Sequence, residues 1–395
     1  MDGYNSFIKA AERHGLDVIV GIQYVDVVRY AFDNNIEEQL ANIQSESTDP
    51  RFTYKYERII YNRAMSVMQS SSSCVGFILG DEWKASEAEL YNSMVNAIRV
   101  AEADAKADGL IKKDLIITTS QLPTYAYDDL TNGSSMLTTD TTKQGDKATA
   151  YKDYIEKFGA SGEFTYDSYS LWNKLIGGHS VDEDWFDNLK YVAEAGIPRT
   201  GVTIQSCAIS GSSYPSKYAP EQKSDIGFQV YTALAYGMKQ INYFCYNQSS
   251  DSNVTDWISN NGDMYNAVKS VNEELSKFEH VLMHYSWKGA LDLGAGKSGT
   301  GASANSERMT SAAVSGARAI VGCMKDVFGN DGYMVANAAG PRTTTESQIT
   351  LTFENADSIV VYRNGVPTTE SLNNGAITLT VGVGEGVFVI PNASN

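Results

Sequence analysis

Two adjacent carboxylates stand at the end of an apolar run early in the chain. Residues 74–83 read CVGFILGDEW, so Asp81 and Glu82 close the run and Trp83 follows them directly. Carboxyl groups serve as general acids, bases or nucleophiles, and an apolar neighbour such as Trp83 raises the pKa of a carboxyl group by disfavouring its charge. Two interpretations stay open: a solvated strand end at which Asp81 caps the next helix, or part of a catalytic site.

Polar and aromatic residues also close other apolar runs of the chain. If these runs are parallel strands, their carboxyl ends meet at one mouth, and the residues there face a common cleft. Asp167 is then the first candidate for a second carboxylate and Asp81 the next. The residues expected to contact a substrate are Trp83, Gln121, Tyr169, Gln205, Tyr246 and Asn247.

The elements that must position these residues alternate along most of the chain. Strand-like runs that are apolar on both faces are followed by helix-like runs, which is typical of a parallel sheet covered by helices. A capping box, Ser86-x-x-Glu89, is expected to open the helix 86–108. The predicted strands are 16–24, 74–83, 114–123, 163–171, 200–207 and 240–247, and the predicted helices 4–14, 54–69, 86–108, 148–158, 183–195, 225–238 and 263–282.

A closed barrel fits this alternation better than an open sheet. No GxGxxG run follows residues 16–24, as an open dinucleotide-binding sheet requires. We therefore predict an α/β chain with a TIM-type (β/α)8 barrel, although six strands are found where eight are needed. Three explanations for the two missing strands stay open. The natural protein is longer, or the true start of the barrel is missed, or another segment closes the barrel.

The pattern changes after residue 284. Gly, Ser and Ala dominate residues 294–317, and alternating β runs follow, with Asn364-Gly365 as a hairpin turn. We predict two domains, a barrel over 1–284 and a small antiparallel β-sandwich over 285–395. Residues 294–298, GAGKS, lack the glycine and the preceding strand of a phosphate-binding loop.

Charge and composition exclude several classes of partner. The net charge is −17 and no run of Lys or Arg occurs, so binding to nucleic acid or to an anionic membrane is not expected. No apolar stretch approaches the length of a membrane span. The 24 tyrosines are many for 395 residues and suit a groove for a neutral, partly apolar ligand such as a sugar. Two carboxylates across such a groove are what glycosidic bond cleavage requires.

The chain resembles bacterial glycoside hydrolases of the large retaining (β/α)8-barrel superfamily that includes β-galactosidases. The resemblance rests on GFILGDEW, TYDSYSLW, GVTIQSC, ALAYGMKQINYFCYN and the C-terminal VYRNG and LTVGVGEGVFV. It implies that GDEW ends barrel strand four, that Glu82 is the acid/base residue, and that strands one and two are missing. The nucleophile of that superfamily is a glutamate ending strand seven, where this chain has Gln205.

A neutral amide cannot attack an anomeric carbon as a carboxylate does. Either Asp167 or Asp81 is the second carboxylate, or the protein binds sugar on a degenerate barrel without cleaving it. The expected partner in both cases is an oligosaccharide or polysaccharide. No cofactor and no metal are expected, because His280-x3-His284 lacks the glutamate of HExxH. The four cysteines are expected to be free, buried thiols, and the N-terminus has no signal-peptide pattern, so secretion follows only if the natural chain is longer.

Overall fold

The computed structural model describes residues 2–127, 130–131, 134–140, 142, 146–174, 178–181, 184–210, 217–247 and 253–393. The chain divides into two compact units, Met1–Tyr166 and Asp167–Asn395, and each is described by itself. Among the described residues, no helix combines the length and the apolar character needed to cross a membrane.

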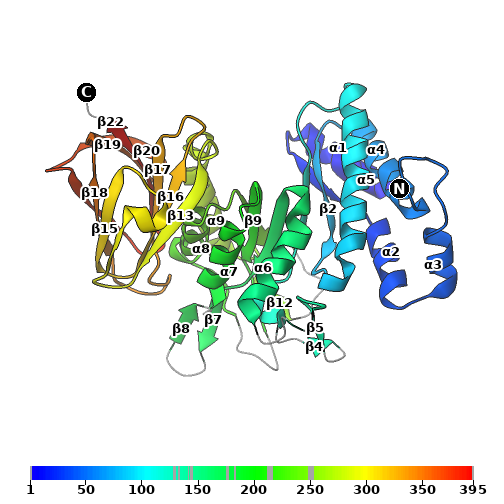
Figure 1. Ribbon diagram of the computed structural model, residues 1–395, viewed down its shortest axis with the longest axis horizontal. Helices are drawn as coiled ribbons and strands as arrows, with labels where there is room; N and C mark the ends of the chain where they lie inside the picture. The colour runs from blue at the N-terminus through cyan, green and yellow to red at the C-terminus, as the bar shows by residue number, and fades with distance from the viewer. Residues whose placement is uncertain are drawn as a thin grey trace. The chain divides into compact units, whose positions relative to one another are not determined.

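The first unit contains a parallel sheet in the order β1-β2-β3 (Figure 1). β1 (Val18–Gly21) pairs with β2 (Cys74–Asp81), and β2 pairs with β3 (Ile116–Ser120). The order in the sheet follows the order in the chain because helices return the chain between successive strands. These helices are α1 (Asp2–Arg13), α2 (Tyr24–Asp33), α3 (Glu37–Ile43), α4 (Lys55–Ser70), α5 (Ala88–Ala107) and α6 (Lys147–Phe158).

Two of these helices, α2 and α3, are absent from the sequence prediction. Val25, Val27 and Val28 favour a strand by intrinsic preference. Helix α2 forms nevertheless, because Val25, Val28 and Ala31 recur at helical spacing and are buried together. The start of α5 also differs from prediction: the Glu87 carboxylate accepts a bond from the Lys84 backbone N–H at 2.6 Å, so Glu87, not Glu89, closes the turn before the helix.

The parallel strands continue into the second unit. β6 (Glu163–Ser168) begins beside β3, where the Gln121 N–H donates to the Thr165 carbonyl at 2.8 Å. β6 also belongs to a sheet of order β11-β9-β6 with β9 (Arg199–Gln205) and β11 (Gln240–Phe244). The helices of this part are α7 (Asp184–Glu194), α8 (Lys223–Ala235), α9 (Gly262–Leu275) and α10 (Glu279–Leu282); residue 183 of the predicted helix 183–195 lies outside the described residues.

Short antiparallel pieces follow the parallel strands. β7 (Leu171–Lys174) pairs with β8 (Gly178–Val181), and β10 (Ala208–Ile209) pairs with β12 (Val254–Thr255). The run predicted as one strand over 163–171 is therefore two, because the backbone leaves β6 after Ser168 and re-enters a strand at Leu171. In the first unit, β4 (Leu130–Thr131) and β5 (Ser134–Ser135) form a similar small hairpin.

The C-terminal part is a β-sandwich of two antiparallel sheets. Its core consists of alternate residues from both sheets, among them Val321, Val335 and Ile349. GAGKS forms the turn between two of its strands, where Lys297 N donates to Gly294 O at 3.0 Å. One sheet has the order β13-β16-β17-β22-β19-β20 and the other β14-β15-β18-β21. The strands are β13 (Ser286–Leu293), β14 (Ser298–Thr300), β15 (Met309–Gly316), β16 (Ala319–Lys325), β17 (Asp331–Asn337), β18 (Ser347–Phe353), β19 (Ala356–Arg363), β20 (Val366–Ser371), β21 (Ala376–Val381) and β22 (Gly386–Ala393).

Helix α8 lies against this sandwich and is buried from Asp225 to its end. At Gly322 of β16, an added Cβ would stand 1.9 Å from the Ala235 carbonyl oxygen, so only glycine permits this approach. The Trp287 indole N–H donates to the same oxygen at 3.2 Å. Arg342 holds the buried Asp225 carboxylate with two hydrogen bonds of 2.8 and 2.7 Å.

The predicted fold class is confirmed: a parallel β/α region precedes antiparallel sheets that form a sandwich. The last parallel strand ends at Phe244, and the first strand of the sandwich begins at Ser286. The division into domains at 284 and 285 stays a prediction.

Candidate active site

The turn that carries Glu82 has an unusual backbone. After β2, Gly80 has φ +70° and Glu82 has φ +47°, and a non-glycine residue rarely adopts the second value. The Glu82 N–H donates to the Ser120 carbonyl at 2.7 Å, and the Thr119 hydroxyl donates to the Gly80 carbonyl at 2.8 Å. The neighbouring strand β3 therefore holds the turn in a conformation that its sequence alone would not favour.

Trp83 anchors the end of this turn from inside the protein. Its side chain is fully buried, and its indole N–H donates to the Leu79 carbonyl at 2.6 Å. The Tyr154 hydroxyl lies 2.6 Å from the Trp83 carbonyl oxygen. The expectation that Trp83 offers its face to a substrate is therefore corrected, since protein atoms already cover the ring; its role is to fix the turn.

Arg29 of α2 connects the same turn to α5. Its guanidinium group holds the buried Glu87 carboxylate with bonds of 2.8 and 3.1 Å. It also donates to the backbone carbonyls of Asp81 and, at 2.8 Å, of Glu82, and its Cζ lies 4.7 Å from the centre of the Trp83 ring. One cation thus bonds to the backbone of both acidic residues while its charge is balanced by Glu87.

The two carboxyl groups have different surroundings. The half-buried Glu82 side chain accepts a hydrogen bond from the Tyr125 hydroxyl, with 3.3 Å between Tyr125 Oη and Glu82 Oε1. Asp81 keeps contact with solvent, but desolvation by nearby protein atoms and then the charge of Glu82 raise the pKa of Asp81 to about 6, against a smaller opposite effect of Arg29. The pair thus combines a hydroxyl-bonded glutamate with an aspartate that holds its proton close to neutral pH.

Gln121 supports this arrangement from the next parallel strand end. It is almost fully buried, and its Oε1 atom lies 2.8 Å from the Tyr154 hydroxyl, which also contacts Trp83. The Leu122 N–H donates to the same hydroxyl at 3.3 Å. Gln121 was expected to contact a substrate; in the structure it bonds to the tyrosine that holds the Glu82 turn.

Gln205 is also occupied by the protein itself. The fully buried side chain accepts from the Leu171 N–H at 2.9 Å and donates to the carbonyls of Tyr218 at 2.7 Å and Cys207 at 3.2 Å. Its backbone exchanges two further bonds with the Gln229 amide. This network joins the end of β9 to the start of β7, to the Tyr218 backbone and to the middle of α8, and it leaves no face of the Gln205 amide to a substrate.

The remaining candidates belong to the second unit as well. Asp167 is buried near the end of β6, and the half-buried Tyr169 stacks on Phe244 with 5.3 Å between ring centres. Tyr246 and Asn247 follow β11 and are exposed. The structure thus gathers Asp81, Glu82, Trp83 and Gln121 in the first unit, whereas Asp167, Tyr169, Gln205, Tyr246 and Asn247 lie in the second.

Four residues at the Glu82 turn escaped the sequence analysis. Arg29 and Glu87 lie in helical turns whose partners are distant in the chain, and Tyr154 is on the buried face of α6. Tyr125 had a usable signal, because it closely follows β3, whose carboxyl end belongs to the same edge of the sheet as the end of β2. No group of three or more potential metal ligands occurs among the residues that the structure describes.

The chain is similar to known proteins in the course of its backbone and not in its sequence. No protein-family model matches the chain. No curated protein matches it in sequence. Among solved structures, the chain is similar to a family 27 β-L-arabinopyranosidase from Geobacillus stearothermophilus, with 10% identity, a TM-score of 0.48, and coverage of 98% of this chain and 77% of the other.

Two further solved structures illustrate the spread of the similarity. A family 39 glycoside hydrolase from Bacteroides cellulosilyticus WH2 shows 11% identity and a TM-score of 0.43, covering 98% of this chain and 70% of the other. A β-galactosidase from Marinomonas ef1 shows 11% identity and a TM-score of 0.36, covering 70% of this chain and 53% of the other. Similarity at this level concerns the course of the backbone and not the chemistry of a site.

Proposed function

We propose that the chain is a glycoside hydrolase in which Glu82 is the general acid. The observation that carries the proposal is the turn itself: a glutamate at the carboxyl end of a parallel strand is held at φ +47° by bonds from β3, α2 and α6. Backbone strain that the surroundings enforce is found preferentially at functional sites. The motif resemblance assigns the same residue to the acid/base role.

The carboxyl pair supports proton transfer at this position. A group that transfers protons works best when its pKa lies near the working pH. Desolvation and the charge of Glu82 raise the pKa of Asp81 to about 6, so Asp81 exchanges its proton close to neutral pH. Tyr125 supplies a hydroxyl that orients the Glu82 carboxyl group.

A second carboxylate is required to stabilise or attack the oxocarbenium-like centre. For this role Asp167 stays the first candidate from the sequence pattern, and Asp81, which lies in the same unit as Glu82, stays the second. A neutral oligosaccharide or polysaccharide is the proposed substrate, because the charge of −17 disfavours anionic ligands.

One observation favours a second candidate function, carbohydrate binding without cleavage. Gln205 stands where the resembled superfamily has its nucleophile. Its side chain is neutral, and both the oxygen and the nitrogen of its amide bond to protein groups. A residue bonded in this way has a structural role and does not act as a nucleophile. A barrel that has lost its nucleophile would still bind sugar but would not cleave it.

Turnover of aryl glycosides separates the two functions. The chain is screened against nitrophenyl glycosides of several sugars and both anomers, with Glu82→Gln and, as a matched control, Glu89→Gln on the exposed face of α5. A hydrolase loses about 10²- to 10⁴-fold in kcat with Glu82→Gln and nothing with Glu89→Gln. Equal rates in both variants would exclude Glu82 as the acid, and binding of a sugar by a folded protein without turnover would support the second function.

A further inference from the structure

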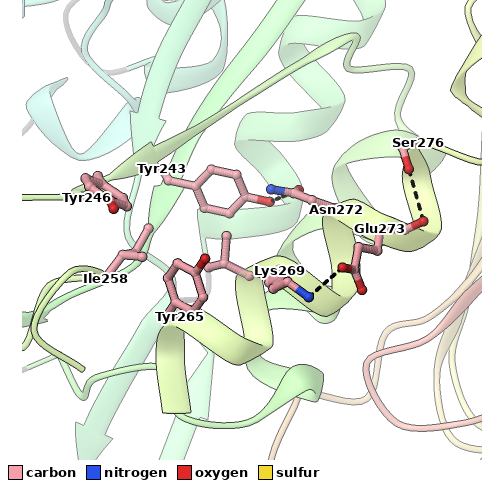
Figure 2. A pocket seen from close by; sticks show the side chains of 9 residues that line it. Tyr243, Tyr246, Ile258, Tyr265, Lys269, Asn272, Glu273 and Ser276 are labelled. Carbon is pink, nitrogen blue, oxygen red and sulfur yellow. Dashed lines mark hydrogen bonds and ion pairs between the residues drawn. The ribbon is translucent and has the colours of Figure 1, made fainter. Parts of the chain in front are cut away.

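A pocket of about 510 Å³ lies between β11 and α9, entirely within the second unit (Figure 2). Its volume falls in the range of small-molecule sites. One wall follows from helical spacing: Tyr265, Val268, Lys269, Asn272 and Ser276 recur every three or four residues, so they share one face of α9 and its C-terminal end. The opposite wall is formed by Tyr243 of β11 with Tyr246 and Ile258.

Two aromatic rings of the pocket are exposed to solvent. Tyr246 is 61% exposed and Tyr265 46% exposed, so solvent reaches a large part of both rings. Figure 2 shows them with Ile258 at one end of the pocket. Exposed amphipathic rings that gather around one cavity indicate a ligand with both apolar faces and polar edges.

The polar groups of the pocket carry no net charge. Lys269 and Glu273 form an ion pair with 2.6 Å between Nζ and Oε1, so each compensates the other. The Tyr243 hydroxyl donates to Asn272 Oδ1 at 2.7 Å, which fixes the Asn272 amide beside the tyrosine ring. A phosphate or carboxylate ligand would meet Glu273, and an organic cation would meet Lys269, so the lining suits a neutral ligand with hydroxyl groups.

We propose that this pocket is a carbohydrate-binding site in which Tyr246 and Tyr265 stack on the apolar faces of sugar rings while Asn272, Lys269 and Glu273 bond to the hydroxyl groups. Its lining contains neither Glu82 nor Asp167, so the proposal does not require hydrolysis by this chain. It assigns to the second unit a site for a neutral glycan.

Calorimetric titration with neutral hexasaccharides tests the proposal. The probes are hexamers of β-1,4-glucose, β-1,4-xylose, β-1,4-mannose and α-1,4-glucose, and the protein carries Glu82→Gln so that no probe is consumed. Tyr246→Ala and Tyr265→Ala are each expected to weaken binding of the accepted probe by roughly 2- to 10-fold. Tyr265→Trp retains an aromatic face and is expected to preserve binding and to report it through a change in emission.

Matched controls keep the result interpretable. Tyr30→Ala removes a ring of similar exposure, 60%, from α2 of the first unit and is expected to leave the affinity unchanged. Since both pocket rings are exposed, the variants should unfold at the temperature of the parent protein. The proposal is overturned if the Tyr246→Ala/Tyr265→Ala double variant binds as the parent does, or if none of the four hexamers changes the emission of Tyr265→Trp. Binding only of an extended polypeptide in the pocket would likewise contradict it.

Discussion

The Arg29 guanidinium group of α2 forms two hydrogen bonds, of 2.8 and 3.1 Å, with the carboxylate of Glu87, which lies 58 residues later in the chain. Both side chains are largely shielded from solvent, and the same guanidinium group bonds to the backbone at Glu82. This pair therefore joins three segments at the point where the proposed acid leaves the sheet.

Arg29→Met should destabilise the protein strongly, because it removes the cation that pairs with the buried Glu87 carboxylate and leaves that carboxylate only its bond from the Lys84 N–H. We expect a loss of about 3 kcal/mol in the free energy of unfolding, measured by urea denaturation. Arg51→Met, which removes exposed ion pairs with Asp49 and Asp104, should cost less than about 1 kcal/mol. The double variant Arg29→Met/Glu87→Gln should recover part of the loss; a purely additive result would show that the two residues do not act as a pair.

Substitutions of Glu82 test the backbone strain. Glycine adopts φ +47° without the steric cost that a side chain meets, so Glu82→Gly should be more stable than Glu82→Ala by about 1 kcal/mol. The same comparison at Asn96, an exposed position inside helix α5, should have the opposite sign, because glycine destabilises a helix interior by about 1 kcal/mol relative to alanine. Thermal unfolding of the four variants measures both differences, and equal signs at the two positions would contradict the strained conformation.

Asp81 should make stability depend on pH. Its pKa in the folded protein is about 6, above the value near 3.9 of an unfolded chain, so the neutral form is the one that the fold favours. Its favourable contribution is complete below about pH 4 and is lost as the pH rises through 6. Relative to wild type, Asp81→Asn should therefore gain stability between pH 4 and 7, by no more than about 1 kcal/mol since solvent reaches the group. Unfolding curves at pH 4, 5, 6 and 7 check the trend; a variant that loses stability with rising pH relative to wild type would refute the sign.

Gln205→Glu should not restore a nucleophile. The new carboxylate would face the Tyr218 and Cys207 carbonyl oxygens to which the amide now donates, and it would be fully buried. We expect a loss of about 2–4 kcal/mol in stability and no gain in glycoside hydrolysis. Gln348→Glu, on the exposed face of β18, serves as the control and should change stability by less than about 0.5 kcal/mol. A rise in aryl glycoside turnover in Gln205→Glu would reverse the structural role assigned to this amide.

The thiols should resist modification in the folded protein. Cys74, Cys207 and Cys323 are buried, and desolvation raises the pKa to about 11 at Cys74 and to about 12 at the other two. Because the thiolate is the reactive form, labelling with a disulfide reagent at pH 8 should reach at most one thiol quickly, the half-buried Cys245. All four should react at once in urea; rapid labelling of more than one in the native protein would contradict the burial.

The position of the candidate acid could be predicted, but its surroundings could not. An acidic residue after a parallel strand lies at the carboxyl edge of the sheet whatever the details of the turn, so Asp81 and Glu82 were found from the pattern alone. The pairing of β2 with β3 shifts register between Ile78 and Asp81, which breaks the alternation from which side-chain directions are read. The burial of Trp83 follows from that break and has no signature in the sequence.

Gln205 shows a second limit of the sequence pattern. A polar residue at a strand end looks the same whether it faces a ligand or bonds to the protein, and the groups that occupy this amide belong to Leu171 and Tyr218, 34 and 13 residues away. Helix α2 was missed for a related reason, since the burial of Val25, Val28 and Ala31 overrides a local preference for strands.

The close approach of Gly322 to Ala235 limits how the chain can be divided. A chain cut after residue 284 would keep α8 but expose to water the face that β16 and β17 now cover, together with the Asp225 carboxylate that Arg342 holds. The sandwich alone would lose the helix against which its sheet is packed. Exchanging this sandwich for that of another protein would therefore require redesign of α8 as well, because α8 and the sandwich bury one face against each other.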